Sequence, residues 1–220
     1  MERWLFTDRT DAGHRLASRL RRMVRGGAVV LGLPRGGVPV AAEVAEALHA
    51  PLDVIVVRKL GVPFHPEVAM GAIAQGGVRV LDTELIAQLG ITPEQLEAVE
   101  RAERATLEAR IALFRTVHPA EELAGRTVVI VDDGIATGAT ASAACRAARS
   151  MGARRVIVAA PVGGPDAITR VHDADEVICL MRPGDFAAVG AYYLHFDQTT
   201  ESEVVELLQA ARARMTGSPS

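Results

Sequence analysis

Two adjacent carboxylates, Asp132 and Asp133, directly follow four β-branched apolar residues at positions 128–131. Such an apolar run predicts a strand buried on both faces, as in a parallel sheet. A short Gly/Thr loop comes next, and the alanine-rich residues 141–150 predict a helix whose first turn is formed by residues 137–140. Free backbone N–H groups and the positive end of a helix dipole attract a phosphate there, whereas carboxylates suit hydroxyl groups or Mg²⁺. The pattern therefore predicts a ligand with vicinal hydroxyls and a phosphate, namely a ribose 5-phosphate group.

The acid pair taken alone also fits the strand–turn–helix of any α/β domain, with Thr137 as an ordinary helix N-cap. The run Thr-Gly-x-Thr at 137–140 lies at the expected distance after the acid pair, which favours the ligand site over this structural alternative. Gly134 and Gly138 do not form a Walker A loop, because the glycine spacing and the lysine of that motif are missing.

Residues 128–140 resemble the phosphoribosyl-diphosphate (PRPP) motif of the type I phosphoribosyltransferases. The resemblance implies that Asp132 and Asp133 bind the ribose hydroxyls, with at most an indirect contact to a metal ion. It also implies that the loop after them binds the 5-phosphate through Ala136, Thr137, Gly138, Ala139 and Thr140. The chain as a whole most resembles bacterial phosphoribosyltransferases whose acceptor is not assigned.

The same resemblance implies an enzyme that transfers a 5-phosphoribosyl group from PRPP to a nucleobase or other nitrogen acceptor, with Mg²⁺ as cofactor and diphosphate as product. One position departs from the pattern of the hypoxanthine-guanine enzymes. Where this chain has Ala136, those enzymes carry an Asp that acts as the base toward the purine ring. A 6-oxopurine acceptor is therefore disfavoured. Two alternatives stay open: a PRPP-binding regulator without transferase activity, and an enzyme of related fold that makes PRPP.

A second anion site is predicted in the turn Pro34, Arg35, Gly36 and Gly37, between an expected strand at 28–33 and an expected helix at 38–49. Glycines let backbone amides approach an anion, and the turn opens onto a helix N-terminus. By resemblance this turn is the diphosphate loop, to which Arg35 would add a guanidinium that can donate two parallel hydrogen bonds to a phosphate. A tight structural turn with a solvent-facing arginine is the alternative.

Arg58 and Lys59 are expected to end the next strand, at 52–57, on the carboxyl edge where doubly wound sheets bind ligands. By resemblance they complete the diphosphate site, with Lys59 and Arg35 as the catalytic cations. Residues 61–69 contain two prolines and a glycine and predict a loop that would close over the site. Phe186 resembles the aromatic residue that stacks on the base in purine phosphoribosyltransferases; packing beneath the C-terminal segment is the alternative.

The alternation of strands and helices predicts a single α/β domain over residues 1–220, with a doubly wound, mainly parallel sheet like that of the type I phosphoribosyltransferases. The core is expected at about 28–82 and 125–182, and a helical insertion at about 83–118. This insertion would pack on the core or on a second subunit of a homodimer. A small C-terminal hood is expected at about 183–200, with contributions from the N-terminus.

The composition is typical of an intracellular enzyme: 220 residues, 49% hydrophobic, and a formal net charge of −3. The negative charge argues against nucleic-acid binding. No apolar run approaches the roughly 18 residues of a membrane span, and the N-terminus lacks a signal-peptide pattern. Cys145 and Cys179 show no metal-binding spacing and are interpreted as buried thiols of a reducing compartment. We therefore expect a cytoplasmic protein whose partners are PRPP and a small nitrogenous acceptor.

Overall fold

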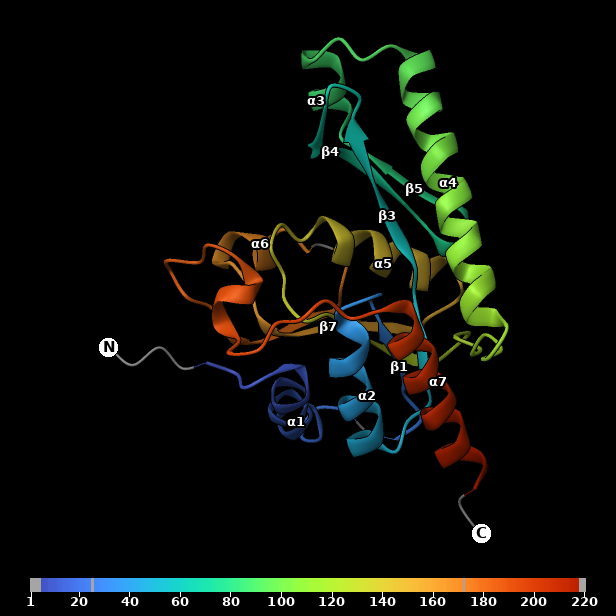
Figure 1. Ribbon diagram of the computed structural model, residues 1–220, viewed down its shortest axis with the longest axis vertical. Coiled ribbons are helices and arrows are strands. Elements are labelled where there is room, and N and C mark those ends of the chain that lie inside the picture. The colour runs from blue at the N-terminus through green and yellow to red at the C-terminus, as the bar shows by residue number, and fades with distance from the viewer. Residues whose placement is uncertain (1–4, 25, 172, 218–220) are drawn as a thin grey trace.

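The chain forms two sheets, a five-stranded parallel sheet and a three-stranded antiparallel sheet that projects from it (Figure 1). The computed structural model describes residues 5–24, 26–171 and 173–217. Among these residues, no helix is long and apolar enough to cross a membrane.

The parallel sheet runs in the order β2, β1, β6, β7, β8, and all of its strand pairs are parallel. Its strands are β1 (Val29–Gly32), β2 (Leu52–Val54), β6 (Thr127–Val131), β7 (Arg155–Val162) and β8 (Glu176–Met181). Because β1 has β2 on one side and β6 on the other, the winding reverses between β1 and β6. The carboxyl ends at such a reversal form the crevice where doubly wound sheets bind ligands. The predicted doubly wound α/β fold is therefore confirmed.

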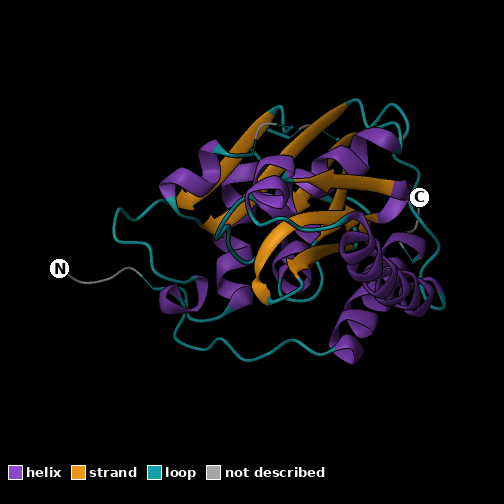
Figure 2. Cartoon of the chain, turned by 90° about the horizontal axis from the view of Figure 1, so that it is seen from above, coloured by secondary structure: helices purple, strands orange, loops and turns teal. Residues whose placement is uncertain are grey.

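Helices cover both faces of this sheet, so that its strands lie between them (Figures 1 and 2). Along β6, Val129 and Val131 belong to one hydrophobic cluster, whereas Val128 and Ile130 belong to another on the opposite face. The first cluster contains buried residues of α1 (Arg9–Leu20), α2 (Gly37–Leu48) and α7 (Glu201–Thr216), and the second those of α5 (Ala139–Ser150) and α6 (Pro165–Thr169). A strand buried on both faces explains the unbroken apolar run in the sequence.

The projecting part, called the arm here, consists of residues 57–115. It contains β3 (Val57–Val62), β4 (His65–Ala74), the short 3₁₀ helix η1 (Gln75–Gly77), β5 (Val78–Leu81), α3 (Thr83–Gln88) and α4 (Pro93–Arg115). Helix α4 begins with a capping box between Thr92 and Gln95. It buries Leu107 and Phe114 in the hydrophobic cluster that also contains α7 residues. The predicted helical segment is thus one wall of a larger unit that also holds three strands.

The loop predicted at 61–69 is wrong, because these residues form the end of the β3–β4 hairpin, where Val62 pairs with His65. Pro66 is tolerated inside β4 because the pairing register shifts twice between Leu60 and Val62, and such irregularities leave donors unpaired. Gly61 is required at this point, since a Cβ there would lie 2.6 Å from the carbonyl oxygen of Pro66. The prolines therefore mark a bulged strand end.

The strand predicted at 52–57 is also wrong in its extent, since β2 ends at Val54 and β3 begins at Val57. Arg58 and Lys59 accordingly lie inside β3, at the base of the arm, and do not end a strand of the parallel sheet. Ile55 and Val56 are both buried, so the apolar run itself carries no sign of the break. The break shows only in long-range backbone hydrogen bonds: the N–H of Ile55 donates to the carbonyl of Gly32, and the N–H of Gln75 donates to the carbonyl of Val56.

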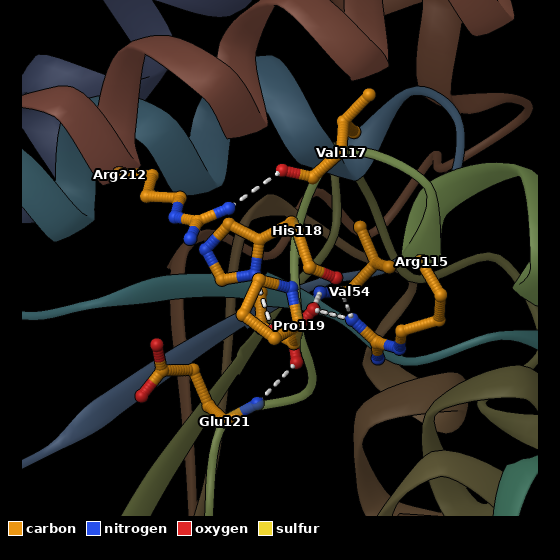
Figure 3. A network of polar contacts seen from close by, with 8 residues as sticks. Val54, Arg115, Val117, His118, Pro119, Glu121 and Arg212 are labelled. Carbon is orange, nitrogen blue, oxygen red and sulfur yellow. Dashed lines mark hydrogen bonds and ion pairs between the residues drawn. The ribbon is translucent and has the colours of Figure 1, made fainter.

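A buried carboxylate ties the end of α4 to the parallel sheet. Asp53 of β2 accepts hydrogen bonds from the Arg115 guanidinium at 2.7 Å and from the backbone N–H of Glu121 at 3.0 Å. Figure 3 shows Arg115, Glu121 and the neighbouring segment around His118, with Arg212 of α7 donating to the carbonyl of Val117. These contacts anchor the return of the chain from the arm to the core.

Residues 183–200 form a cap of irregular chain beside the carboxyl ends of the strands, with a 3₁₀ turn η2 (Val189–Tyr192). The N-terminal segment joins it through backbone bonds: Phe6 donates to Tyr192 at 2.9 Å, and Leu194 donates to Phe6 at 2.8 Å. Phe6, Tyr192 and Tyr193 are buried together in a small cluster of their own. The expected hood segment and the residues around Phe6 therefore form one packed layer.

Candidate active site at the end of the parallel sheet

The loop after β6 leads directly into the start of α5. Gly138 is the N-cap of that helix with φ of 82°, a left-handed conformation that favours glycine. A Cβ at this position would also lie 2.6 Å from the carbonyl oxygen of Ala167. Because the N-cap residue is a glycine, no cap side chain accepts a hydrogen bond from the N–H groups of the first turn. Thr137 accepts only a long 3.4 Å contact from the N–H of Ala139. The first turn thus presents backbone N–H groups where an anion can bind.

Asp132 lies beside this loop and faces a small cleft of about 120 Å³. Lys59 of the arm and Thr140 of α5 line the same cleft. Burial raises the pKa of Asp132 well above its usual range, the adjacent Asp133 carboxylate adds to the increase, and Lys59 opposes it. The cleft therefore joins a carboxylate, a cation and a helix N-terminus, which are groups that suit a phosphorylated polyol.

Asp133 faces a different cleft, of about 350 Å³, on the side of the hood. Its Oδ2 atom lies 2.9 Å from both Nε and Nη2 of Arg9, the first residue of α1. Burial raises the pKa of Asp133, and the Arg9 guanidinium opposes this increase. Two neighbouring carboxylates thus line different clefts, because successive side chains leave the end of β6 in different directions.

The turn 34–37 passes within contact of the acid pair. A Cβ on Gly36 would lie 2.0 Å from Oδ2 of Asp133, and one on Gly37 would lie 2.6 Å from the carbonyl oxygen of Val131. The peptide bond between Pro34 and Arg35 is cis. Only glycines allow this close approach, which gives a physical reason for the Gly-Gly pair that the sequence analysis singled out.

The residues predicted to bind diphosphate do not all line one cleft. Pro34, Arg58 and Lys59 line a cleft of about 550 Å³ between the hairpin and α4, whereas Arg35 and Gly36 line the hood-side cleft with Asp133. The Arg58 guanidinium is paired with Glu103 of α4, with contacts of 2.7 and 2.6 Å. Lys59 is exposed and lines both the arm-side cleft and the Asp132 cleft. Lys59 therefore lies between the predicted diphosphate site and the predicted ribose 5-phosphate site.

Phe186 stacks against Tyr192, with ring centroids 5.8 Å apart and planes 4° from parallel, and lies close to Gly164. The aromatic ring in the hood-side cleft is that of Phe196, which the sequence analysis did not single out. The Arg9 guanidinium lies 4.0 Å from the centroid of this ring. The geometry places Phe186 within the packing of the hood and Phe196 beside the acid pair.

Arg9 and Phe196 escaped the sequence analysis because no local pattern marks them. Arg9 is one of several arginines around α1, and its partner Asp133 lies 124 positions away. Arg15, on the same helix, instead pairs with Asp11 one turn earlier. Within the part of the chain that the structure describes, no group of three or more His, Cys, Asp or Glu side chains gathers to hold a metal ion.

The comparisons with known proteins agree with this geometry. A model of the phosphoribosyl transferase domain matches residues 8–196. Two Mycobacterium tuberculosis proteins, from strains CDC 1551 and H37Rv and each named "putative phosphoribosyl transferase", are 53% identical to the chain over 208 residues. The match covers 94% of this chain and 47% of each relative, so the chain spans about half the length of these curated relatives.

Solved structures show the same fold. The protein TT1426 from Thermus thermophilus is 44% identical, with a TM-score of 0.81 over 94% of this chain and 98% of that one. A hypothetical protein from Neisseria gonorrhoeae, solved with bound ppGpp, is 15% identical, with a TM-score of 0.53 over 95% and 96% of the two chains, and shares the fold alone. With a family match over most of its length and relatives at this identity, the chain belongs to the phosphoribosyl transferase domain family.

Proposed function

We propose that the protein transfers a 5-phosphoribosyl group from PRPP to a nitrogenous acceptor and releases diphosphate. The observation that carries this proposal is the grouping at the reversal point of the sheet. The acid pair at the end of β6 has the N-terminus of α5 on one side and the Gly-Gly turn after β1 on the other. Carboxylates that accept hydrogen bonds from hydroxyl groups lie here between two backbone segments that bind anions. This arrangement matches the chemistry of PRPP, which carries phosphate groups at both ends of a ribose.

In this proposal the 5-phosphate binds residues 136–140 and the ribose hydroxyls bind Asp132 and Asp133. The diphosphate binds the turn 34–37 and Lys59. Arg58 plays a smaller part in this assignment than the sequence analysis expected, because Glu103 already holds its guanidinium. The exposed end of the β3–β4 hairpin, which carries Phe64 at 72% exposure, takes the covering role first given to a loop.

The reaction breaks the bond from ribose C1 to the diphosphate oxygen and forms a bond from C1 to the acceptor nitrogen, which loses a proton. Negative charge grows on the departing diphosphate. Lys59, Arg35 and the backbone amides of the turn 34–37 are the groups of this chain that can stabilise that charge where it develops. No covalent nucleophile is needed for such a displacement.

A magnesium ion fits this site as a companion of the substrate. Mg²⁺ prefers oxygen ligands, keeps several waters, and is commonly held by one or two carboxylates together with substrate phosphates. Asp132 and Asp133 are the carboxylates at hand and would contact the ion indirectly, through its waters, and the described residues add no further cluster of ligands. When bound, the ion would neutralise part of the charge on the diphosphate.

Incubation with PRPP, Mg²⁺ and a panel of nucleobases, with measurement of diphosphate release, tests the proposal. Release that depends on the acceptor and falls in Asp132→Asn and Asp133→Asn supports it, because an amide accepts hydroxyl hydrogen bonds less strongly than a carboxylate. Binding of PRPP without release by any acceptor would instead indicate the regulatory alternative. Absence of PRPP binding would contradict both.

A further inference from the structure

Arg9 holds one oxygen of Asp133 with two nitrogens of its guanidinium. Nε and Nη2 both lie 2.9 Å from Oδ2. The third nitrogen, Nη1, donates to the carbonyl oxygen of Asp197 at 2.6 Å, and the flat face of the group lies over the ring of Phe196. The Arg9 and Asp133 side chains are only 12% and 15% exposed. The Arg9 guanidinium is therefore held in place on several sides, and it holds the Asp133 carboxylate in place through its two hydrogen bonds.

The backbone of Asp133 is held independently. Its N–H donates to Oδ1 of Asp132 at 2.9 Å, and its carbonyl accepts from the hydroxyl of Tyr193 at 2.6 Å. On another side, the turn passes close to Oδ2, since a Cβ on Gly36 would lie 2.0 Å from this atom. Both Arg9 contacts fall on Oδ2, so Arg9 itself leaves Oδ1 available for another contact.

We propose that Arg9 is a positioning residue, which holds Asp133 by one oxygen so that the other is presented to a ribose hydroxyl of bound PRPP. This inference rests on the proposed function. Holding the carboxylate in its binding orientation before the ligand arrives lowers the ordering cost of binding. Arg9 also supplies a positive charge beside two adjacent carboxylates that otherwise repel each other. Since Arg9 is the first residue of α1 and also bonds Asp197, α1 and the hood jointly set the geometry of the ribose site.

The test compares Arg9→Ala, Arg9→Lys and Arg15→Ala, with ribose 5-phosphate and inorganic phosphate as calorimetric probes. Arg15→Ala is a matched control: Arg15 lies on the same helix, bonds Asp11 at 2.8 Å and lies 5.4 Å from the ring of Phe6, outside the site. We expect Arg9→Ala to weaken ribose 5-phosphate about tenfold, the scale of a hydrogen bond to a charged group. Inorganic phosphate, which has no ribose hydroxyl for Asp133 to bind, should bind unchanged. Arg9→Lys should restore part of the loss, and Arg15→Ala should change neither affinity.

A double-mutant cycle separates positioning from general damage. If Arg9 acts through Asp133, then Arg9→Ala adds no further loss of ribose 5-phosphate affinity in an Asp133→Asn background. Additive losses, an equal loss for inorganic phosphate, or unchanged ribose 5-phosphate affinity in Arg9→Ala would each overturn the inference alone. Failure of the wild-type protein to bind ribose 5-phosphate or PRPP would overturn the proposed function, and this inference with it.

Discussion

Asp132 follows β6, a strand with both faces packed, whereas Lys59 lies on β3 of the arm, where the far half of the hairpin is open to solvent. The end of β6 is fixed by hydrophobic clusters on both sides of the parallel sheet. The far end of the hairpin instead exposes Phe64 and Val68, and Arg58 at its base is held by a partly exposed ion pair. The two regions meet in one cleft, where Lys59 lines the same space as Asp132.

This difference separates two tasks. A packed strand end can hold a sugar phosphate in a defined position before any reaction, because interiors resist small displacements. An arm with an exposed end has fewer interactions that resist movement, and such elements suit a step that needs opening and closing. We therefore expect changes at the sheet end to affect binding of the sugar phosphate, and changes on the arm to affect turnover.

The largest effect, on stability, is expected at the ion pair that joins the end of α4 in the arm to β2 of the parallel sheet. Asp53→Ala removes the buried carboxylate that holds Arg115, and losing one partner of such a pair should lower the free energy of unfolding by about 3 to 5 kcal/mol. Denaturant unfolding measures it. Glu176→Ala is the control, since its pair with Arg155 is 32% and 42% exposed and should contribute at most about 1 kcal/mol. Equal losses in the two variants would show that the joint is no stronger than a surface contact.

Lys59→Ala should reduce turnover about 100-fold, the lower range for losing one donor that stabilises developing charge. Ribose 5-phosphate, which lacks the diphosphate, should bind with little change. Steady-state rates together with calorimetry of ribose 5-phosphate give both quantities. Because Lys59 also lines the Asp132 cleft, equal weakening of ribose 5-phosphate and PRPP at an unchanged rate would assign the lysine to the sugar-phosphate site.

Gly36→Ala should weaken PRPP binding about tenfold or more, because a Cβ at 2.0 Å from Oδ2 of Asp133 forces the carboxylate or the turn to move, and overpacking of this kind typically costs about 1–3 kcal/mol. Gly26→Ala is the matched control, since nothing lies within 4 Å of the added atom. Calorimetry with PRPP compares the two. Normal binding by Gly36→Ala would show that the acid pair can shift, and that the sheet end is less rigid than its packing indicates.

Glu103→Gln should have the smallest effect. The pair with Arg58 is 27% to 29% exposed, and such pairs contribute about 0–1 kcal/mol to stability. The variant leaves the Arg58 guanidinium less tightly held in the arm-side cleft. We expect a change in the KM for PRPP of less than about fivefold, with unchanged affinity for ribose 5-phosphate. A large loss of stability would show that the arm is fixed as firmly as the core.

Local patterns were sufficient for most of the parallel sheet. The apolar run at 128–131 and the alanine-rich run at 141–150 predicted β6 and α5, because burial on both faces and helix formation each leave a mark on consecutive residues. The glycines at 36, 37 and 138 were informative for the same reason, since close approach and positive φ exclude other side chains locally.

The errors fell where long-range contacts override local signals. Two prolines and a glycine at 61–69 indicated a loop, but the pairing of β3 with β4 absorbs them in an irregular register. The buried residues Ile55 and Val56 appeared to continue a strand that in fact ends at Val54. In both places the backbone partners come from distant strands, and no nearby residue records them.

The sequence by itself determined the doubly wound fold and a pair of carboxylates beside a helix start, because these depend on patterns within about fifteen consecutive residues. Only the tertiary structure decided which cleft each carboxylate faces, that Lys59 lies beside Asp132, and that Arg9 holds Asp133. The physical reason is that packing of the whole chain creates these contacts between residues far apart in sequence, and such a contact leaves no periodic trace in either segment.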